Sequence, residues 1–93
     1  MKATLLKKER IRLSDDSFVE VSVWKTPEPV PGSSHCYKYS LAYIVHGICS
    51  LRYDNETGKG DHRHVGMEEK PYKFSSLERL VDDFWSDVAQ LGE

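Results

Sequence analysis

The sequence predicts an α+β domain, an antiparallel sheet of four to five strands with one C-terminal amphipathic helix packed on it. Three observations support this prediction: alternating apolar residues fill much of the first half of the chain, short turn segments separate them, and the last residues repeat apolar side chains at helical spacing. With 93 residues, the chain is long enough for a single domain over residues 1–93, with one core and room for one site.

The first two strands are expected at residues 3–13 and 18–25, on either side of a turn at 15–17. The first segment is mixed in composition. The second carries valine at every other position from Val19 to Val23, which is the period of a half-buried strand. We therefore expect these two segments to form a hairpin.

Residues 26–34 form the next connection, with three prolines and Gly32. Proline has no backbone N–H to donate to a sheet, so this segment is expected to be an extended loop. It is longer than an ordinary connection and could cover a site or wrap around a sheet edge.

The clearest strand is expected at residues 36–45, and 48–54 is expected to return beside it after a two-residue turn at His46-Gly47. Such a turn places Val45 opposite Ile48. Counting back along the pair then places Tyr43 opposite Ser50, Leu41 opposite Arg52 and Tyr39 opposite Asp54. This register predicts that Tyr39, Arg52 and Asp54 lie together on one face of the sheet.

A short edge strand at 70–74 and a helix complete the expected fold. Ser75 and Glu78 form the pattern of a capping box at the start of the helix, and Gly92 is a suitable stop. The apolar face of the helix repeats at intervals of three and four, at Leu77, Leu80, Val81, Phe84, Trp85, Val88 and Leu91.

Charge and cysteine content restrict the classes of function. The net charge of −2 gives the chain no overall attraction for a polyanion, so a nucleic acid would have to be bound locally. Residues 1–12 are basic and residues 78–93 are acidic. Cys36 and Cys49 do not form a disulfide framework, and no apolar signal or membrane segment is visible, so a cytoplasmic protein with reduced thiols is expected.

Residues 52–64 are the candidate site because they combine imidazoles, carboxylates, cations and glycines in one short segment. A segment this polar can also be an ordinary solvated loop. The alternation at residues 61–64 favours a site, because in an extended chain His62 and His64 point to the same face.

These residue types fit RNA cleavage, which needs a base, an acid and cations around the phosphate. His62 and His64 are the candidate base and acid, Asp61 could orient an imidazole, and Tyr53 could donate a proton or stack on a base. The candidate substrate-binding residues are Arg52, Lys59, Arg63, Asp54 and Tyr39. No metal ion and no organic cofactor is expected in this mechanism.

Two other readings of the segment remain open. In the first, His62 and His64 bind a metal ion with Asp54 or His35 as the third ligand, as in a metal-binding phosphodiesterase. In the second, the segment is a non-enzymatic surface that docks a partner protein. A nucleotide-binding P-loop is not expected, because the Gly-Lys-Gly at 58–60 lacks the longer P-loop pattern and no helix follows it.

Residues 36–88 resemble the TumE-like toxins of prokaryotic toxin–antitoxin modules. The resemblance rests on the runs 38–47, 52–64, 72–74 and 83–88, and above all on Arg-Tyr-Asp-Asn followed by Gly-Lys-Gly-Asp-His-x-His. It implies a small cytoplasmic protein that arrests growth and is neutralised by a helix-turn-helix antitoxin. It also implies a site at Arg52, Tyr53, Asp54, Lys59, Asp61, His62 and His64, without a reaction. Exposed strand edges would also permit a homodimer.

Overall fold

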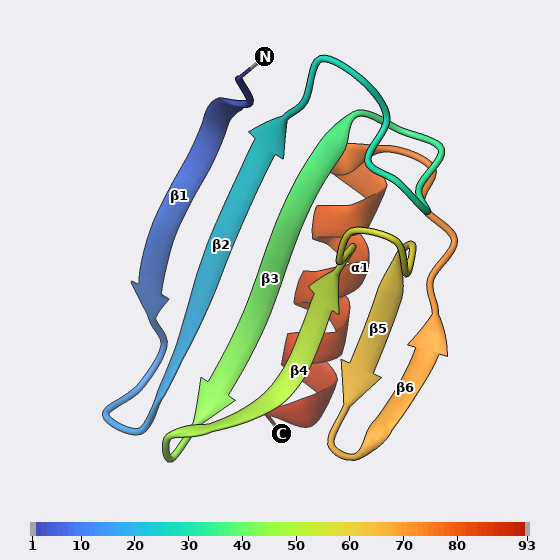
Figure 1. Ribbon diagram of the computed structural model, residues 1–93. Coiled ribbons are helices and arrows are strands. Elements are labelled where there is room, and N and C mark those ends of the chain that lie inside the picture. Colours follow the sequence, from blue (N-terminus) through green and yellow to red (C-terminus); the bar gives the residue numbers. More distant parts are fainter. Residues whose placement is uncertain (1, 93) are drawn as a thin grey trace.

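A six-stranded antiparallel sheet and one helix make up the fold in the computed structural model, which describes residues 2–92 (Figure 1). Each strand pairs with the strands next to it in the chain, so the sheet is a simple meander. The elements are β1 (Thr4–Arg12), β2 (Ser17–Lys25), β3 (Tyr37–Val45), β4 (Ile48–Asp54), β5 (His62–Val65), β6 (Glu68–Pro71) and α1 (Leu77–Leu91). The predicted α+β class is confirmed, with one strand more than the upper limit of the prediction.

The additional strand comes from the hairpin of β5 and β6. β5 includes the end of the polar segment at residues 52–64, and β6 lies at 68–71 instead of the edge strand expected at 70–74. All four residues of β6 are exposed. A strand with no buried face shows no apolar alternation, which explains why periodicity did not reveal this hairpin.

The β3–β4 hairpin begins as predicted and then departs from the predicted register. His46 and Gly47 both have positive φ (52° and 76°), and Val45 pairs with Ile48. A bulge then follows, so that Tyr43 lies opposite Leu51 rather than Ser50.

The prediction that Tyr39, Arg52 and Asp54 share a face is therefore wrong. Arg52 lies opposite Ala42 and Asp54 opposite Ser40, on the face away from Tyr39. Burial gives the physical reason: with the bulge, Leu51 and Tyr53 enter the core, whereas the regular register would have buried Arg52 and Asp54 in their place.

The core lies between α1 and one face of the sheet. Leu80 and Phe84 of the helix are fully buried, and Val88 is nearly so. The helix begins one residue later than predicted, because the side chain of Ser76 rather than Ser75 accepts the backbone N–H of Arg79. Gly92 ends it as expected. The sheet residues of the core are Val19, Val21, Val23, Tyr39, Leu41, Tyr43, Leu51 and Tyr53.

The opposite face of the sheet, which we call the open face, is not covered by the helix. In Figure 1, α1 lies behind β3, β4 and β5, and the open face is turned toward the reader.

Both cysteines are half-buried free thiols. Among the residues that the structure describes, no helix has the length and apolar character needed to cross a membrane.

Candidate functional site

The nine residues predicted as site residues lie in three places. Arg52, Asp54, His62 and His64 project from β4 and β5 on the open face. Tyr39, Tyr53, Asp61 and Arg63 lie on the side of the sheet that faces α1. Lys59 is exposed in the β4–β5 connection and lies 3.5 Å from Glu56. The structure therefore divides the predicted site between the two faces of the sheet.

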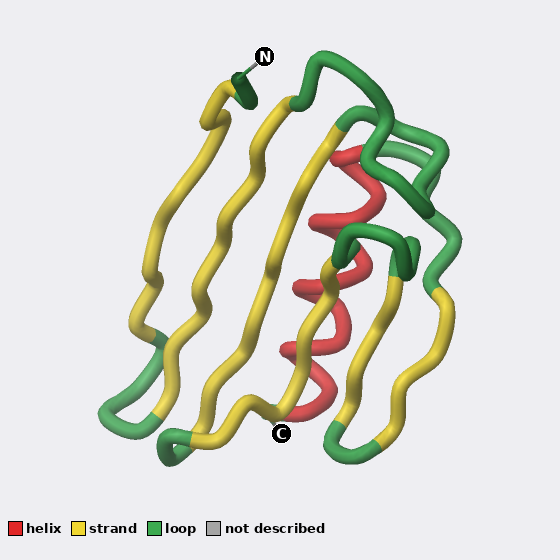
Figure 2. The backbone as a smooth tube through the Cα atoms, viewed as in Figure 1, coloured by secondary structure: helices red, strands yellow, loops and turns green. Residues whose placement is uncertain are grey.

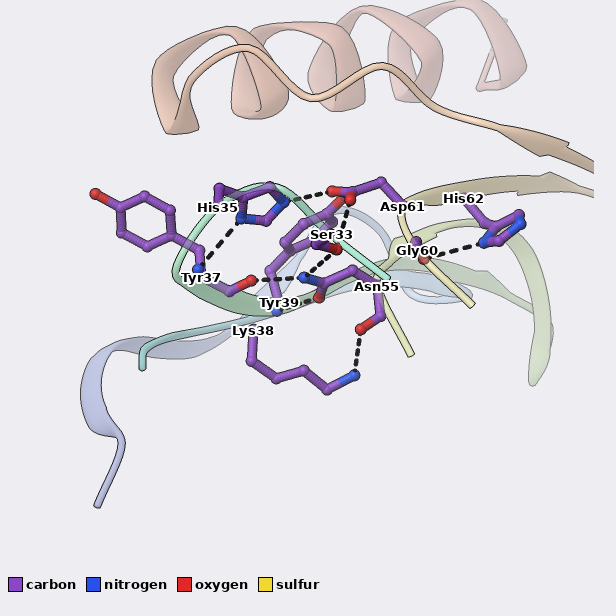
Figure 3. A network of polar contacts seen from close by, with 9 residues as sticks. All are labelled: Ser33, His35, Tyr37, Lys38, Tyr39, Asn55, Gly60, Asp61 and His62. Atoms are coloured by element: carbon purple, nitrogen blue, oxygen red, sulfur yellow. Dashed lines mark hydrogen bonds and ion pairs between the residues drawn. The ribbon is translucent and has the colours of Figure 1, made fainter. Parts of the chain in front are cut away.

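Asp61 is the centre of a buried polar cluster, which we call the Asp61 cluster and which comprises Ser33, His35, Tyr39, Asn55 and Asp61 (Figure 3). Its carboxylate accepts hydrogen bonds from the Ser33 hydroxyl at 2.6 Å, the Tyr39 hydroxyl at 2.6 Å and His35 Nε2 at 2.7 Å. Its side chain is only 8% exposed. These three hydrogen bonds connect the Asp61 carboxylate to the β2–β3 loop and to β3.

His35 is held by both of its ring nitrogens. Nδ1 accepts the backbone N–H of Tyr37 at 3.2 Å, so Nε2 carries the proton that it donates to Asp61. The ring also stacks on Phe74, with 3.7 Å between the ring centroids. His35, one of the two third ligands that the metal hypothesis offered beside His62 and His64, is therefore engaged elsewhere. Within residues 2–92, no group of three or more His, Cys, Asp or Glu side chains is arranged to hold a metal ion.

Two loops meet at the Asp61 cluster. The β2–β3 and β4–β5 connections lie at the same end of the sheet (Figure 2) and cross where Gly32 approaches Gly60. Both glycines have positive φ, and a Cβ on Gly60 would lie 2.8 Å from the Gly32 carbonyl oxygen. Only residues without a side chain fit this crossing.

Asn55 completes the connection between the loops, and the sequence analysis gave it no role. It is fully buried, its side-chain oxygen accepts the backbone N–H of Tyr39, and its NH2 group donates to the Tyr37 carbonyl at 2.6 Å. The available signal was its place in the Arg-Tyr-Asp-Asn run, since an asparagine after a strand can satisfy the backbone groups of a turning chain.

The ionisation of Asp61 is tied to this cluster. Burial acts to raise the pKa of the carboxyl group, but the hydrogen bonds from Ser33, Tyr39 and His35 outweigh burial and leave the pKa below its usual value. Burial, together with the hydrogen bond to Asp61, strongly raises the pKa of Tyr39. Asp61 is thus a carboxylate and Tyr39 a neutral donor at neutral pH.

Tyr53 and Arg63 connect the sheet to the helix. Arg63 Nε donates to Asp87 of α1 at 2.7 Å and to the Tyr53 hydroxyl at 3.2 Å, while the Tyr53 hydroxyl donates to the same Asp87 carboxylate. The bond to Asp87 raises the pKa of Arg63, and burial raises that of Tyr53. Both side chains are already engaged in holding α1 on the sheet.

The histidine pair, His62 and His64, lies on the open face between two carboxylates, with 6.5 Å between the ring centroids. His64 Nε2 is 3.6 Å from Asp54, and His64 Nδ1 is 3.8 Å from Glu69. His62 Nε2 is 3.8 Å from the same Glu69. These separations exceed hydrogen-bond distance, so within the described residues the ring nitrogens other than His62 Nδ1 form no hydrogen bond and can bond a ligand.

His62 has a defined orientation on this face. Its Nδ1 lies 3.1 Å from the carbonyl oxygen of Gly60, and Figure 3 shows the ring pointing away from Asp61. A carbonyl only accepts, so Nδ1 carries a proton and Nε2 of the neutral ring keeps its lone pair. Asp61 and His62 are consecutive in the chain but serve different faces of the sheet.

Three residues that the sequence analysis did not assign also lie on the open face. Glu69 faces the pair from β6. Trp24 and Lys38 help to line a hollow of about 460 Å³ that also includes Arg52 and Asp54. The alternation in β2 could have identified Trp24, because it places this indole on the polar face of the strand, where there is no core for it to pack in.

Residues 2–91 match the family model described as Toxin TumE. The match covers nearly the whole chain and extends the resemblance seen over residues 36–88. No curated protein and no solved structure matches the chain.

Proposed function

Because the chain belongs to the TumE toxin family, we propose that it is the toxin of a toxin–antitoxin module and arrests growth by cleaving RNA without a metal ion. One observation carries the proposed reaction: two imidazoles lie side by side on an uncovered sheet face, with the Arg52 position directly opposite His64. This arrangement supplies an acid, a base and a cation at one accessible place.

The proposed reaction is an internal transfer at one phosphodiester. His62 Nε2 takes the proton of the ribose 2′-hydroxyl, and the 2′-oxygen attacks the adjacent phosphorus. A bond forms between the 2′-oxygen and phosphorus while the bond from phosphorus to the 5′-oxygen breaks. Protonated His64 gives its proton to the departing 5′-oxygen, which leaves a 2′,3′-cyclic phosphate and a 5′-hydroxyl.

The remaining predicted residues take two kinds of role in this proposal. Arg52 stabilises the charge that develops on the phosphate, and Lys59 in the neighbouring loop attracts the RNA backbone. Asp61 positions the histidine pair, because it anchors the loop from which β5 starts. Tyr53 and Arg63 hold β4 and β5 against α1, so they also position the histidine pair indirectly.

The family implies an antitoxin partner. We propose that this partner is a helix-turn-helix protein that acts in the same cytoplasm and neutralises the toxin by covering the open face. An uncovered face that carries the reactive groups is the surface a neutralising partner must block.

The test is induced expression in a bacterial host of the wild-type chain and of a His62→Ala, His64→Ala double variant at equal soluble yield. Loss of one acid or base catalyst typically costs about 10²- to 10⁴-fold in rate. We therefore expect arrest and RNA fragments with cyclic phosphate ends from the wild type only. His46→Ala is the matched control, because His46 lies in the β3–β4 turn with a 70% exposed side chain.

Three further results bear on the proposal. Co-expression of the cognate antitoxin should restore growth. Cleavage by the purified protein should continue in the presence of a chelator, whereas loss of cleavage would favour the metal-dependent alternative. Arrest by the double variant at wild-type strength would overturn the proposed role of the histidine pair.

A further inference from the structure

We propose that the open face beside the histidine pair is a binding site for single-stranded RNA, with a base stacked on Trp24 and the backbone held by Lys8, Lys38 and Arg52. This inference rests on the proposed function, since it names the form of RNA that the same face would take.

The open face is hollowed in its middle rather than filled. A hollow of about 430 Å³ adjoins the 460 Å³ hollow next to Trp24, and the two share Ser22, Ser40 and Arg52 in their linings. Small side chains at Ser22, Ser40 and Ala42 occupy the central strands β2 and β3. Larger side chains stand around this floor, which leaves space for a flat base and a ribose.

Strand register connects the hollows to the histidine pair. One row of neighbouring positions runs across the sheet from Lys8 through Ser22, Ser40 and Asp54 to His62. Four strand spacings of about 4.8 Å give this row a length of roughly 19 Å. That length can hold several nucleotides and delivers their backbone to the imidazoles.

The charges around the two hollows favour a polyanion. Every carboxylate that lines the two hollows has a cationic or imidazole neighbour within 4 Å, as shown by the pairs Glu9–Lys7, Glu20–Arg10, Asp54–His64 and Glu56–Lys59. Lys8, Lys38 and Arg52 form no ion pair with any residue between 2 and 92. Because no carboxylate neutralises these three cations, the face is locally attractive to phosphates although the whole chain carries a charge of −2.

Trp24 selects a single strand over a duplex. It is half-buried on the open face, and its register partner on β3 is Lys38, whose ammonium group is held at 2.8 Å from the Asn55 carbonyl oxygen. An indole beside a fixed cation can stack on a base whose phosphate the cation holds. Bases within a duplex stack on each other and cannot offer a face to Trp24.

Binding can be measured apart from cleavage in the His62→Ala, His64→Ala background. The probes are a labelled single-stranded RNA of about 12 nucleotides, the same RNA as a duplex, and a DNA strand of the same sequence. We expect the single-stranded RNA to bind most tightly and Trp24→Ala to weaken it about 5- to 100-fold. Lys8→Ala should reduce the slope of log affinity against log salt by about one.

Two variants serve as controls. Trp24→Phe keeps an aromatic ring and should restore most of the affinity, which separates stacking from a folding defect. Arg79→Ala removes a cation on α1 that is paired with Asp83 and should leave binding unchanged. Equal affinity for the duplex or for DNA, or an unchanged affinity in Trp24→Ala, would overturn the proposal. Binding that depends on Trp24, together with a wild-type chain that cuts no RNA, would instead overturn the proposed reaction and leave the binding site standing.

Discussion

The Asp61 cluster and the histidine pair contain similar side chains and begin at consecutive residues, yet their geometry differs. Around Asp61, three donors lie within 2.7 Å of one buried carboxylate. Around His64, the nearest carboxylates are 3.6 and 3.8 Å away on an uncovered face. Complete hydrogen bonding indicates a structural role, whereas polar groups held near each other without direct bonds remain available to a ligand.

The two clusters also depend on each other. Asp61 and Gly60 connect the β4–β5 loop to the β2–β3 loop, and the Gly60 carbonyl oxygen in turn orients the His62 ring. The Asp61 cluster therefore makes the loops rigid, and the histidine pair supplies the reactive groups. This division predicts that substitutions of the histidine pair can remove activity without a loss of stability.

The largest loss of stability is expected from Gly60→Ala. The new Cβ would lie 2.8 Å from the Gly32 carbonyl oxygen, and φ at this position is +81°. We expect a loss of about 3–4 kcal/mol in the free energy of unfolding. The matched control is Gly58→Ala, which has φ of +87° but no atom within 4 Å of the new Cβ beyond its two chain neighbours, and which should cost only about 1 kcal/mol. Urea unfolding of both variants checks this, and equal losses would show that the loop crossing is not tight.

A smaller loss is expected from Asp61→Ala, which leaves Ser33, His35 and Tyr39 without their common acceptor. We expect about 2–3 kcal/mol. His64→Ala on the open face should change stability by less than about 0.5 kcal/mol. Thermal unfolding of both variants measures the contrast. A destabilised His64→Ala protein would contradict the separation of roles between the two clusters.

The smallest effect is a pH dependence of stability due to Asp61. Because the folded-state pKa of Asp61 is lowered, the carboxylate contributes its full stability above the unfolded pKa of about 3.9, and this contribution is lost as the pH falls through the lower folded value. The wild type should therefore lose more stability than Asp61→Asn between about pH 5 and pH 2. Urea midpoints at several pH values test this, and parallel curves for the two proteins would count against it.

The sequence predicted the fold well where apolar residues alternate. The valines of β2, the β3 strand, the His46-Gly47 turn and the apolar face of α1 were all identified. Local periodicity could not reveal the β6 edge strand, whose residues are all exposed, or the bulge in the β3–β4 pair. Two registers of a strand pair bury different side chains. Whether a bulge forms depends on which of these side chains the assembled core can accommodate.

The candidate site was harder to predict because its division depends on contacts between distant residues. His35 and Asp61 are 26 positions apart, and no local sequence pattern around either residue predicts their hydrogen bond. The alternation at 61–64 did place His62 and His64 on one face, as predicted. The same alternation could not show that Arg63 faces a helix that follows it by more than a dozen residues.

The position of α1 after all six strands also affects how the chain can fold. Every strand pairs with its neighbour in sequence, so the six strands can assemble through successive local hairpins with little loss of loop entropy. The apolar side of that sheet stays exposed until α1 emerges from the ribosome and docks. Folding of this sheet and helix during synthesis therefore cannot finish before α1 has been translated, and a chain interrupted before α1 would display an unprotected apolar surface instead of a working protein.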